Sequence, residues 1–338
     1  RSQLRVHLLD GAGDDFTQEP LTSNRRNAPS PHATFIASTL EAAPSADSTL
    51  VNGACESIPL PPGALQLSHS RVVDSLGRCS TRALLAALER ARAERAHLVL
   101  MPIGGPNYAD VLLTAKIREL AGAGVTVVAG AGNSGPAWGT VLNPADDGLV
   151  VAVGGHTTNG TLAVWSARGV ANWEGPLGAP RAAVDILALG EYRGRALDGG
   201  CRREWGTSVA SPLVVAALAR ALARVVEPSR RKAILNPAAL KQLVHAAGAP
   251  LPNLSIFEQG MGRLDDARLD VAVADFAPRA TAFPPELDLA GSGARDESRG
   301  ALWPLDAPLY ARGQPRTINV TIHNSRATLS RIARPPEW

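Results

Sequence analysis

The middle of the chain alternates between short, uninterrupted apolar stretches and helical patterns, and this alternation restricts the fold more than any other feature. Apolar stretches at 97–101, 125–129 and 149–153 predict strands that are buried on both faces. Helical patterns precede the first stretch and separate it from the second. This order is typical of a parallel sheet covered by helices on both faces, so the sequence predicts an α/β fold with three layers and a mostly parallel sheet.

The two helices of this region have recognisable starts and apolar faces. Ser80 or Thr81 can cap the first helix, and the second is expected over 109–122, ending at Gly122-Ala123-Gly124. The residues predicted to face the core are Leu84, Leu85, Leu88 and Ala91 in the first helix, and Val111, Leu112, Ile117 and Leu120 in the second.

The flanking regions add further elements. Residues 4–9 read as a strand that ends in a turn at Asp10–Gly13, followed by a loop over 14–31. A helix starts at His32, and residues 41–80 form an irregular strand-and-loop region. A long helix is expected from about Val209 to Val226, and Asn236-Pro237 begins another.

After about residue 276 prolines recur and helical periodicity stops, while Thr317–His323 alternates like a β-strand. We therefore expect one domain over 1–275 and, over 276–338, a linker and the beginning of a β-rich C-terminal domain. Because the chain opens directly on a core strand, we also expect that an N-terminal part is missing.

Charge and composition exclude some classes of function. The net charge of +3 is too small for a nucleic-acid partner. No apolar run is long enough to span a membrane. Three cysteines, Cys55, Cys79 and Cys201, allow one disulfide without indicating the pair. Sequons at Asn159, Asn253 and Asn319 are compatible with a secretory compartment.

Chemically useful residues follow the predicted strands or begin the predicted helices. Asp10, Gly104-Gly105 and Asn133 come just after strands, and the carboxyl ends of parallel strands meet at one edge of the sheet. His32 begins one helix and Ser208 another. A serine hydroxyl needs a base to become nucleophilic, the base needs a carboxylate to orient it, and the oxyanion needs donors.

Each of these residues also has an ordinary structural explanation when taken alone. Ser208 could be a helix N-cap, Asp10 could stabilise a turn, Asn133 could belong to an Asn-Gly type turn, and a single His is more often a packing residue. The order Asp, His, Asn, Ser along the chain favours catalysis over these separate explanations.

The chain resembles the subtilase family of serine peptidases, and within it the branch of the site-1 proteases (subtilisin/kexin-isozyme type). The resemblance covers most of the chain after residue 80. The stretches that carry it are Ile103–Pro106, Gly132-Asn133, Gly135-Pro136, Asn143–Asp146, Val153–Gly155, Trp165–Gly169, Gly199–Arg202, Gly206–Pro212, Phe257–Gly260 and Pro335–Trp338.

The resemblance implies a role for each catalytic group. Ser208 would attack the scissile carbonyl, His32 would take its proton and pass it to the leaving amine, and Asp10 would orient His32. The Asn133 amide and the Ser208 backbone N–H would hold the oxyanion. The expected substrate-binding residues are Ile103, Gly104, Gly105, Gly132, Gly206 and Thr207, with Ile103–Gly105 adding a strand to the substrate backbone.

The resemblance also implies a biological setting. Proteases of this branch cut membrane-anchored transcription-factor precursors on the lumenal side of the Golgi, with Arg four residues before the cut. They are zymogens with their own propeptide and a C-terminal membrane anchor. No cofactor is required for the chemistry, although calcium supports activity; the sequence identifies no metal ligands.

Several departures from the family pattern favour an alternative, a catalytically impaired pseudoenzyme that acts as a binding module. Ala33 replaces a Gly after the histidine, Pro102 a Ser before the substrate-pairing segment, and Trp205 a small residue before Gly206. Two other classes fit less well. An α/β-hydrolase would need a second Gly after Ser208 and a later His, and no ligand spacing indicates a metal hydrolase.

Overall fold

An eight-stranded sheet forms the centre of the molecule in the computed structural model, which describes residues 3–12, 31–40, 55–56, 60–73, 78–108, 110–170, 182–196, 198–285 and 319–326. The strand order is β2-β1-β3-β4-β5-β6-β10-β9, and every pair is parallel except β10 with β9. The strands are β1 Leu4–Ala12, β2 Leu65–Val73, β3 Leu98–Met101, β4 Thr126–Gly130, β5 Val151–His156, β6 Ile186–Leu189, β9 Gly248–Ala249 and β10 Arg263–Leu264. The predicted α/β class is confirmed.

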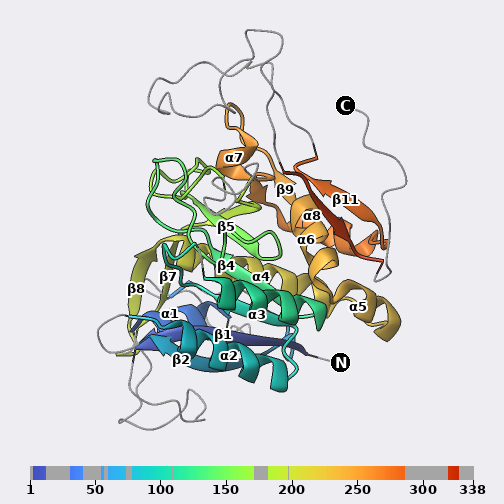
Figure 1. The fold of residues 1–338 in the computed structure, drawn as a ribbon, viewed down its shortest axis with the longest axis horizontal. Helices are drawn as coiled ribbons and strands as arrows, with labels where there is room; N and C mark the ends of the chain where they lie inside the picture. Colours follow the sequence, from blue (N-terminus) through green and yellow to red (C-terminus); the bar gives the residue numbers. More distant parts are fainter. Residues whose placement is uncertain are drawn as a thin grey trace.

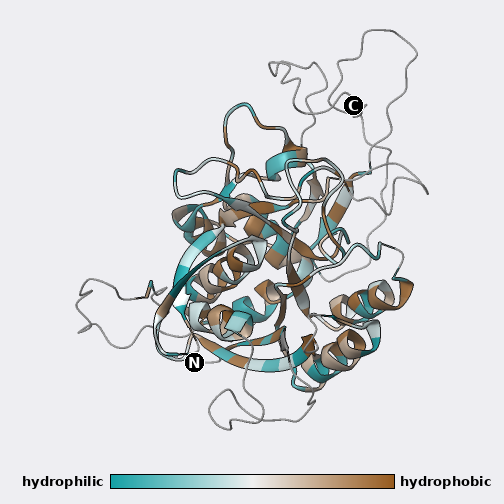
Figure 2. Ribbon diagram, turned by 90° about the vertical axis from the view of Figure 1, so that its left-hand side faces the viewer, coloured by the Kyte–Doolittle hydropathy of each residue, from teal (hydrophilic) through white to brown (hydrophobic). Residues whose placement is uncertain are grey.

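Helices cover both faces of this sheet, as Figure 1 shows. Successive side chains of β3 point to opposite faces of the sheet. Leu98 and Leu100 pack with α1 and α4, whereas Val99 and Met101 pack with α2 and α3. In Figure 2 the helices carry both brown and teal residues, as expected for helices with one buried side. The helices are α1 Pro31–Leu40, α2 Thr81–Ala93, α3 Val111–Gly122, α4 Thr207–Ala223, α5 Pro228–Ile234, α6 Pro237–Ala246, α7 Ile256–Gln259 and α8 Asp266–Ala274.

The predicted apolar face of α3 was wrong in part. Val111 and Leu112 are 65% and 60% exposed, and the buried residues are Leu113, Ile117 and Leu120. The cap explains the difference: Asp110 accepts a hydrogen bond from the Leu113 backbone N–H (3.0 Å) and fixes where the first turn begins. From that start, residues i, i+4 and i+7 form the buried stripe, and Val111 and Leu112 fall outside it.

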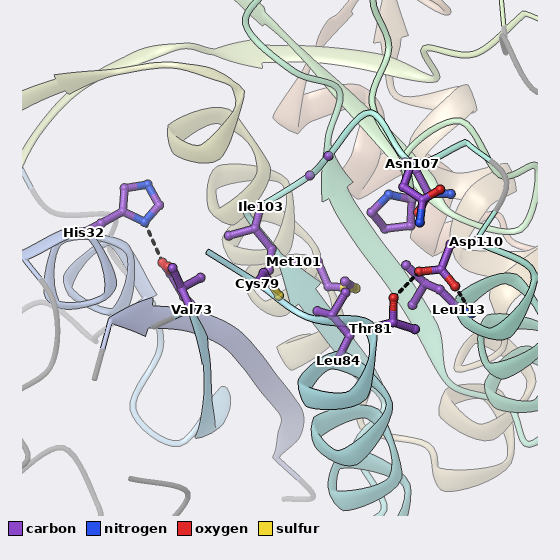
Figure 3. A pocket seen from close by; sticks show the side chains of 15 residues that line it. His32, Val73, Cys79, Thr81, Leu84, Met101, Ile103, Asn107, Asp110 and Leu113 are labelled. Carbon is purple, nitrogen blue, oxygen red and sulfur yellow. Dashed lines mark hydrogen bonds and ion pairs between the residues drawn. The ribbon is translucent and has the colours of Figure 1, made fainter. Parts of the chain in front are cut away.

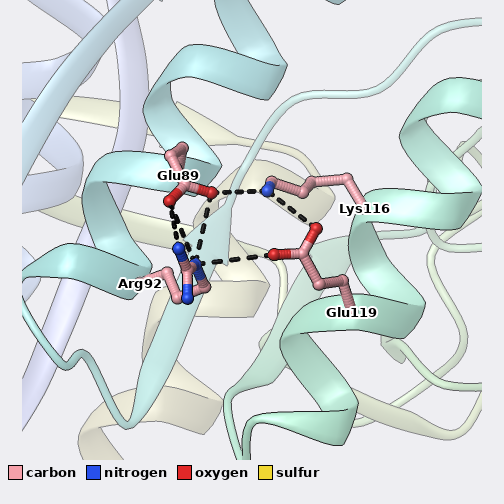
Figure 4. A network of polar contacts seen from close by, with 4 residues as sticks. All are labelled: Glu89, Arg92, Lys116 and Glu119. Atoms are coloured by element: carbon pink, nitrogen blue, oxygen red, sulfur yellow. Dashed lines mark hydrogen bonds and ion pairs between the residues drawn. The ribbon is translucent and has the colours of Figure 1, made fainter.

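In α2 the predicted N-cap is confirmed, since Ser80 accepts a hydrogen bond from the Ala83 backbone N–H. Leu88 and Ala91 are buried as expected, whereas Leu84 and Leu85 are only half-buried and Ala83 and Ala87 take their place in the core. Four charged side chains, Glu89, Arg92, Lys116 and Glu119, tie α2 to α3 (Figure 4). Exposed ion pairs of this kind contribute about 0.2–1 kcal/mol each.

One prediction near the N-terminus was wrong. The turn expected from Asp10 does not start there, because β1 continues through Ala12, pairing Asp10 with Arg71 and Ala12 with Val73. The region expected to be an irregular strand-and-loop region over 41–80 does contain a strand, the nine-residue β2, which runs parallel to β1 at the edge of the sheet. The sequence does not delimit this strand, because Ser68 to Arg71 in its middle are all polar. The loop expected over 14–31 lies almost wholly outside the described residues.

Near the C-terminus, β11 (Ala280–Phe283) and β12 (Thr321–Asn324) form an antiparallel pair. Gln242 of α6 donates hydrogen bonds to the carbonyls of Arg279 and His323, both at 2.8 Å. This pair of strands therefore packs directly against α6. Among the described residues no helix is long and apolar enough to cross a membrane.

Candidate active site

His32 and Asp10 form the first half of the candidate site. Asp10 lies near the end of β1 and is buried, while His32 occupies the first turn of α1 and is half-exposed. The Nδ1 atom of His32 lies 2.7 Å from the Asp10 Oδ2 atom. This leaves Nε2 as the nitrogen that can exchange a proton with a nucleophile. The sequence-predicted pair is brought together although its members are 22 positions apart in the chain.

The pKa of His32 is raised above its ordinary value of 6.5. Burial alone would lower this pKa, because it disfavours the charged imidazolium. The hydrogen bond and the negative charge of Asp10 outweigh burial, and Glu204 adds to them while Arg202 opposes them. The site is therefore built to stabilise an imidazolium, which is the form that a general base acquires when it takes a proton.

Ser208 lies in the first turn of α4, and Gly206 rather than Ser208 is the N-cap. The ordinary explanation of Ser208 as a capping residue is therefore wrong. Gly206 has φ +135°, and a Cβ atom there would lie 2.9 Å from Asn133 Nδ2 and 3.3 Å from Ser208 Oγ. A glycine is thus needed for the Asn133 amide and the Ser208 hydroxyl to face the same space.

Asn133 is held with its amide nitrogen toward this space. Its Oδ1 accepts hydrogen bonds from the Thr207 backbone N–H (2.9 Å) and from Thr207 Oγ1 (3.1 Å). Thr207 Oγ1 in turn accepts from the Gly132 backbone N–H (3.0 Å). With Oδ1 occupied, the Nδ2 group remains as the donor beside Ser208. The first backbone N–H groups of a helix, Ser208 among them, also lack intrahelical partners and can bind an anion.

A pocket of about 530 Å³ opens beside His32 (Figure 3). His32 lies at one end, Met101 and Ile103 lie in the middle, and Asn107 and Asp110 lie at the other end. Of the predicted substrate-binding residues, Ile103, Gly104 and Gly105 line this pocket, while Gly132, Gly206 and Thr207 build the surroundings of Asn133 and Ser208.

Sequence reasoning missed several lining residues, in particular Leu84 and Asp110. Asp110 is the N-cap of α3, and its Oδ2 accepts a hydrogen bond from Thr81 Oγ1 (2.5 Å). The capping pattern of α3 could have identified it as a residue at the carboxyl edge of the sheet. Cys79 is also exposed in this pocket, whereas Cys55 and Cys201 form the disulfide that the sequence left open.

The departures from the family pattern occupy distinct positions. Ala33 is completely buried in α1, and Pro102 is buried directly after β3. Trp205 ends β8 (Cys201–Trp205), which pairs with β7 (Glu191–Arg195) in a separate hairpin. It is 57% exposed and packs against Trp165. Trp205 is not among the described residues that line the pocket of Figure 3.

Comparisons with known proteins identify the family of the chain. The model of the subtilase family matches residues 11–262, so the chain belongs to the subtilase family of serine peptidases. It is 36% identical over 256 residues to the membrane-bound transcription factor site-1 protease of Mus musculus and to the subtilisin-like protease SBT6.1 of Arabidopsis thaliana. These alignments cover 75% of this chain but only 23% and 24% of the relatives, so the chain spans about a quarter of their length.

A solved structure shows the same fold. The self-cleaved protease domain of PatA is 26% identical, with a TM-score of 0.58 over 80% of this chain and 96% of that one. The predicted membership of the subtilase family, the subtilisin-like fold and the class of enzyme, a serine protease, are confirmed.

Proposed function

We propose that the protein is a serine endopeptidase in which Asp10, His32 and Ser208 form the catalytic triad and Asn133 supplies a donor of the oxyanion hole. The observation that carries this proposal is the 2.7 Å contact between Asp10 and His32. Ser208 and Asn133 support it, because their polar groups face one space across Gly206.

In the proposed reaction, Ser208 Oγ attacks the scissile carbonyl while His32 Nε2 takes the hydroxyl proton. The oxyanion is stabilised by Asn133 Nδ2 and by the Ser208 backbone N–H at the start of α4. His32 then gives its proton to the leaving amine, and water repeats the sequence to release the acyl group. The acyl side of the substrate would pair with Ile103–Gly105 along the pocket of Figure 3.

We also propose that its substrates are membrane-anchored precursor proteins with Arg upstream of the cut, processed on the lumenal side of the secretory pathway. The 36% identity to a site-1 protease supports this substrate class. The Asp110 carboxylate, at the end of the pocket opposite His32, suits a guanidinium group. A disulfide and three exposed sequon asparagines favour an oxidising, secretory environment.

The resemblance also suggests activation from a zymogen by removal of the propeptide, and support of activity by calcium. In the described parts of the chain, no group of three or more His, Cys, Asp or Glu side chains could hold a metal ion. No described residue is therefore assigned to calcium.

A fluorophosphonate probe tests the catalytic proposal, because it labels only an activated serine. We expect labelling of the protein, loss of labelling in Ser208→Ala, and unchanged labelling in the control Ser134→Ala, which removes another exposed hydroxyl near Asn133. Absence of labelling in well-folded protein would instead favour the pseudoenzyme that acts as a binding module.

Peptide profiling tests the substrate proposal. We expect faster cleavage of peptides with Arg four residues before the cut than of peptides with uncharged citrulline there. This preference should shrink in Asp110→Asn. Equal rates for both peptides would contradict the proposed substrate class without affecting the triad.

A further inference from the structure

A buried ion pair joins two stretches of the chain that have no part in the proposed chemistry. Arg168 lies in the loop after β5, and Glu258 lies in α7, 90 positions further along the chain. Arg168 Nη1 lies 3.5 Å from Glu258 Oε1, and the two side chains are 10% and 2% exposed. Charged side chains are almost never buried to this extent unless they are paired and hydrogen-bonded. The guanidinium group therefore has a defined task inside the protein.

The Arg168 guanidinium binds the backbone of the loop to which it belongs. Its Nη2 group donates hydrogen bonds to the carbonyls of Ala163 (3.0 Å) and Val164 (3.2 Å). Its Nε group donates to the carbonyl of Ser166 (3.2 Å). Glu258 is itself fixed, because its carboxylate takes part in the capping box of α7. Arg168 thus ties the backbone of this loop to α7.

The same backbone supports the loop that carries Asn133. On one side of Asn133, the Gly132 carbonyl accepts a hydrogen bond from the Ala167 backbone N–H (3.0 Å). On the other side, the Gly135 backbone N–H donates to the Trp165 carbonyl (2.9 Å). Asn133 itself is exposed, so the contacts of its two neighbours hold its backbone in place.

We propose that Arg168, paired with Glu258, is a positioning residue that holds Asn133 where its amide can stabilise the oxyanion. This inference rests on the proposed function of Asn133 and adds the part of the chain that keeps it in place. A misplacement of about 1 Å can cost a catalytic group roughly 10²-fold in rate. A donor on an exposed loop therefore gains from a rigid, buried support. Arg168 acts through the loop and not on the substrate itself.

Arg168→Lys tests the proposal, because lysine keeps the charge but lacks the planar fork that reaches three carbonyls and a carboxylate. We expect kcat for a fluorogenic peptide to fall about tenfold, with KM changed by less than about twofold, because the oxyanion forms only after the substrate is bound. Arg231→Lys is the matched control. Arg231 is buried to the same extent and donates to the Leu222 carbonyl, at the end of α4 away from Ser208. It should change kcat by less than about twofold.

The same substitution in an Asn133→Ala background separates positioning from a general loss of structure. If Arg168 acts through Asn133, Arg168→Lys should lower kcat by less than about twofold once the amide is gone, because the effects of coupled groups do not add. An equal loss in both backgrounds would overturn the positioning role and leave the proposed peptidase intact. If Asn133→Ala alone left kcat unchanged, the proposed role of Asn133 would fail, and this inference with it.

Two further measurements decide the question if Arg168→Lys does not fold. Glu258→Gln keeps the size of the side chain but removes its charge from the guanidinium, and we expect the same loss of kcat and the same dependence on Asn133. Hydrogen exchange needs no variant. In the wild-type protein the amide hydrogens of Gly135 and Ala167 should exchange more slowly than that of the exposed Ser134. Equally fast exchange at all three positions would show that the loop is not held and would overturn the proposal.

Discussion

Replacing Asp10 with Asn tests the candidate site most directly. Asp10 is almost fully buried, and its Oδ2 lies 2.7 Å from His32 Nδ1. An Asn of the same size can donate to Nδ1, which would place the ring proton on Nε2 and remove the acceptor that Ser208 needs. In serine proteases this change lowers kcat about 10⁴-fold. That factor corresponds to about 5 kcal/mol of transition-state stabilisation.

The pH dependence of the residual activity provides a second measure of the same change. His32 must be neutral to act as a base, so kcat/KM rises as pH passes its pKa. In the wild type this pKa is raised above 6.5, because Asp10 outweighs the effect of burial. Without the carboxylate, burial dominates and the pKa falls. We therefore expect the acidic limb of the profile above pH 6.5 in the wild type and at lower pH in Asp10→Asn.

Cleavage of a fluorogenic peptide between about pH 5 and 9 supplies both quantities, and circular dichroism checks the fold of each variant. Asp270→Asn is the matched control, because Asp270 is a surface carboxylate paired with Arg224. It should change kcat by less than about threefold. The reasoning would be refuted if Asp10→Asn kept more than about a tenth of the wild-type kcat, or if its acidic limb did not move to lower pH.

Three further predictions concern the oxyanion, acid stability and the disulfide. Asn133→Ala should lower kcat about 10²–10³-fold with little change in KM, measured on the same peptide. Burial lowers the pKa of His7 from 6.5 to about 4, although Glu94 opposes it. The free energy of unfolding, measured with urea, should therefore decrease by about 3 kcal/mol as the pH falls between those two values, because the folded chain disfavours protonation of His7. In His7→Gln the free energy of unfolding should depend less on pH over the same range. The pair Cys55→Ser and Cys201→Ser, which removes a cross-link between residues 146 positions apart, should cost about 2–5 kcal/mol in the same unfolding assay.

The central layers of the fold were predictable because their signals are local. Strands β3 and β4 are continuous apolar runs, and α6 begins at Asn236-Pro237, where Asn236 accepts from the Ala239 backbone N–H as its sequence indicates. Strand β2 was not predictable in this way. The alternation of apolar and polar residues stops after Leu67, because Ser68 to Arg71 are all polar, and pairing with β1 carries the strand through this polar stretch.

The candidate site shows the same division between local and long-range information. Ser208 and Asn133 were predicted as site residues because short glycine-containing motifs contain them. The effect of Glu204 on His32 and the contact between Trp165 and Trp205 arise between segments far apart in the chain. A single sequence contains no period or spacing that brings these segments together, so such contacts become visible only when the fold is known.

The β7–β8 hairpin connects these long-range effects to the nucleophile. Cys201 begins β8 and is covalently bound to Cys55, while Gly194 of β7 packs closely against Phe35 of α1. Further along β8, Arg202 and Glu204 act on His32 in opposite directions, and Trp205 leads through Gly206 into α4. A shift of this strand would therefore change two features at once. It would move the charges near His32, and it would move the start of α4, which bears Ser208. We therefore expect the disulfide, which links one end of β8 to Cys55, to stabilise the geometry of the proposed site as well as the folded chain.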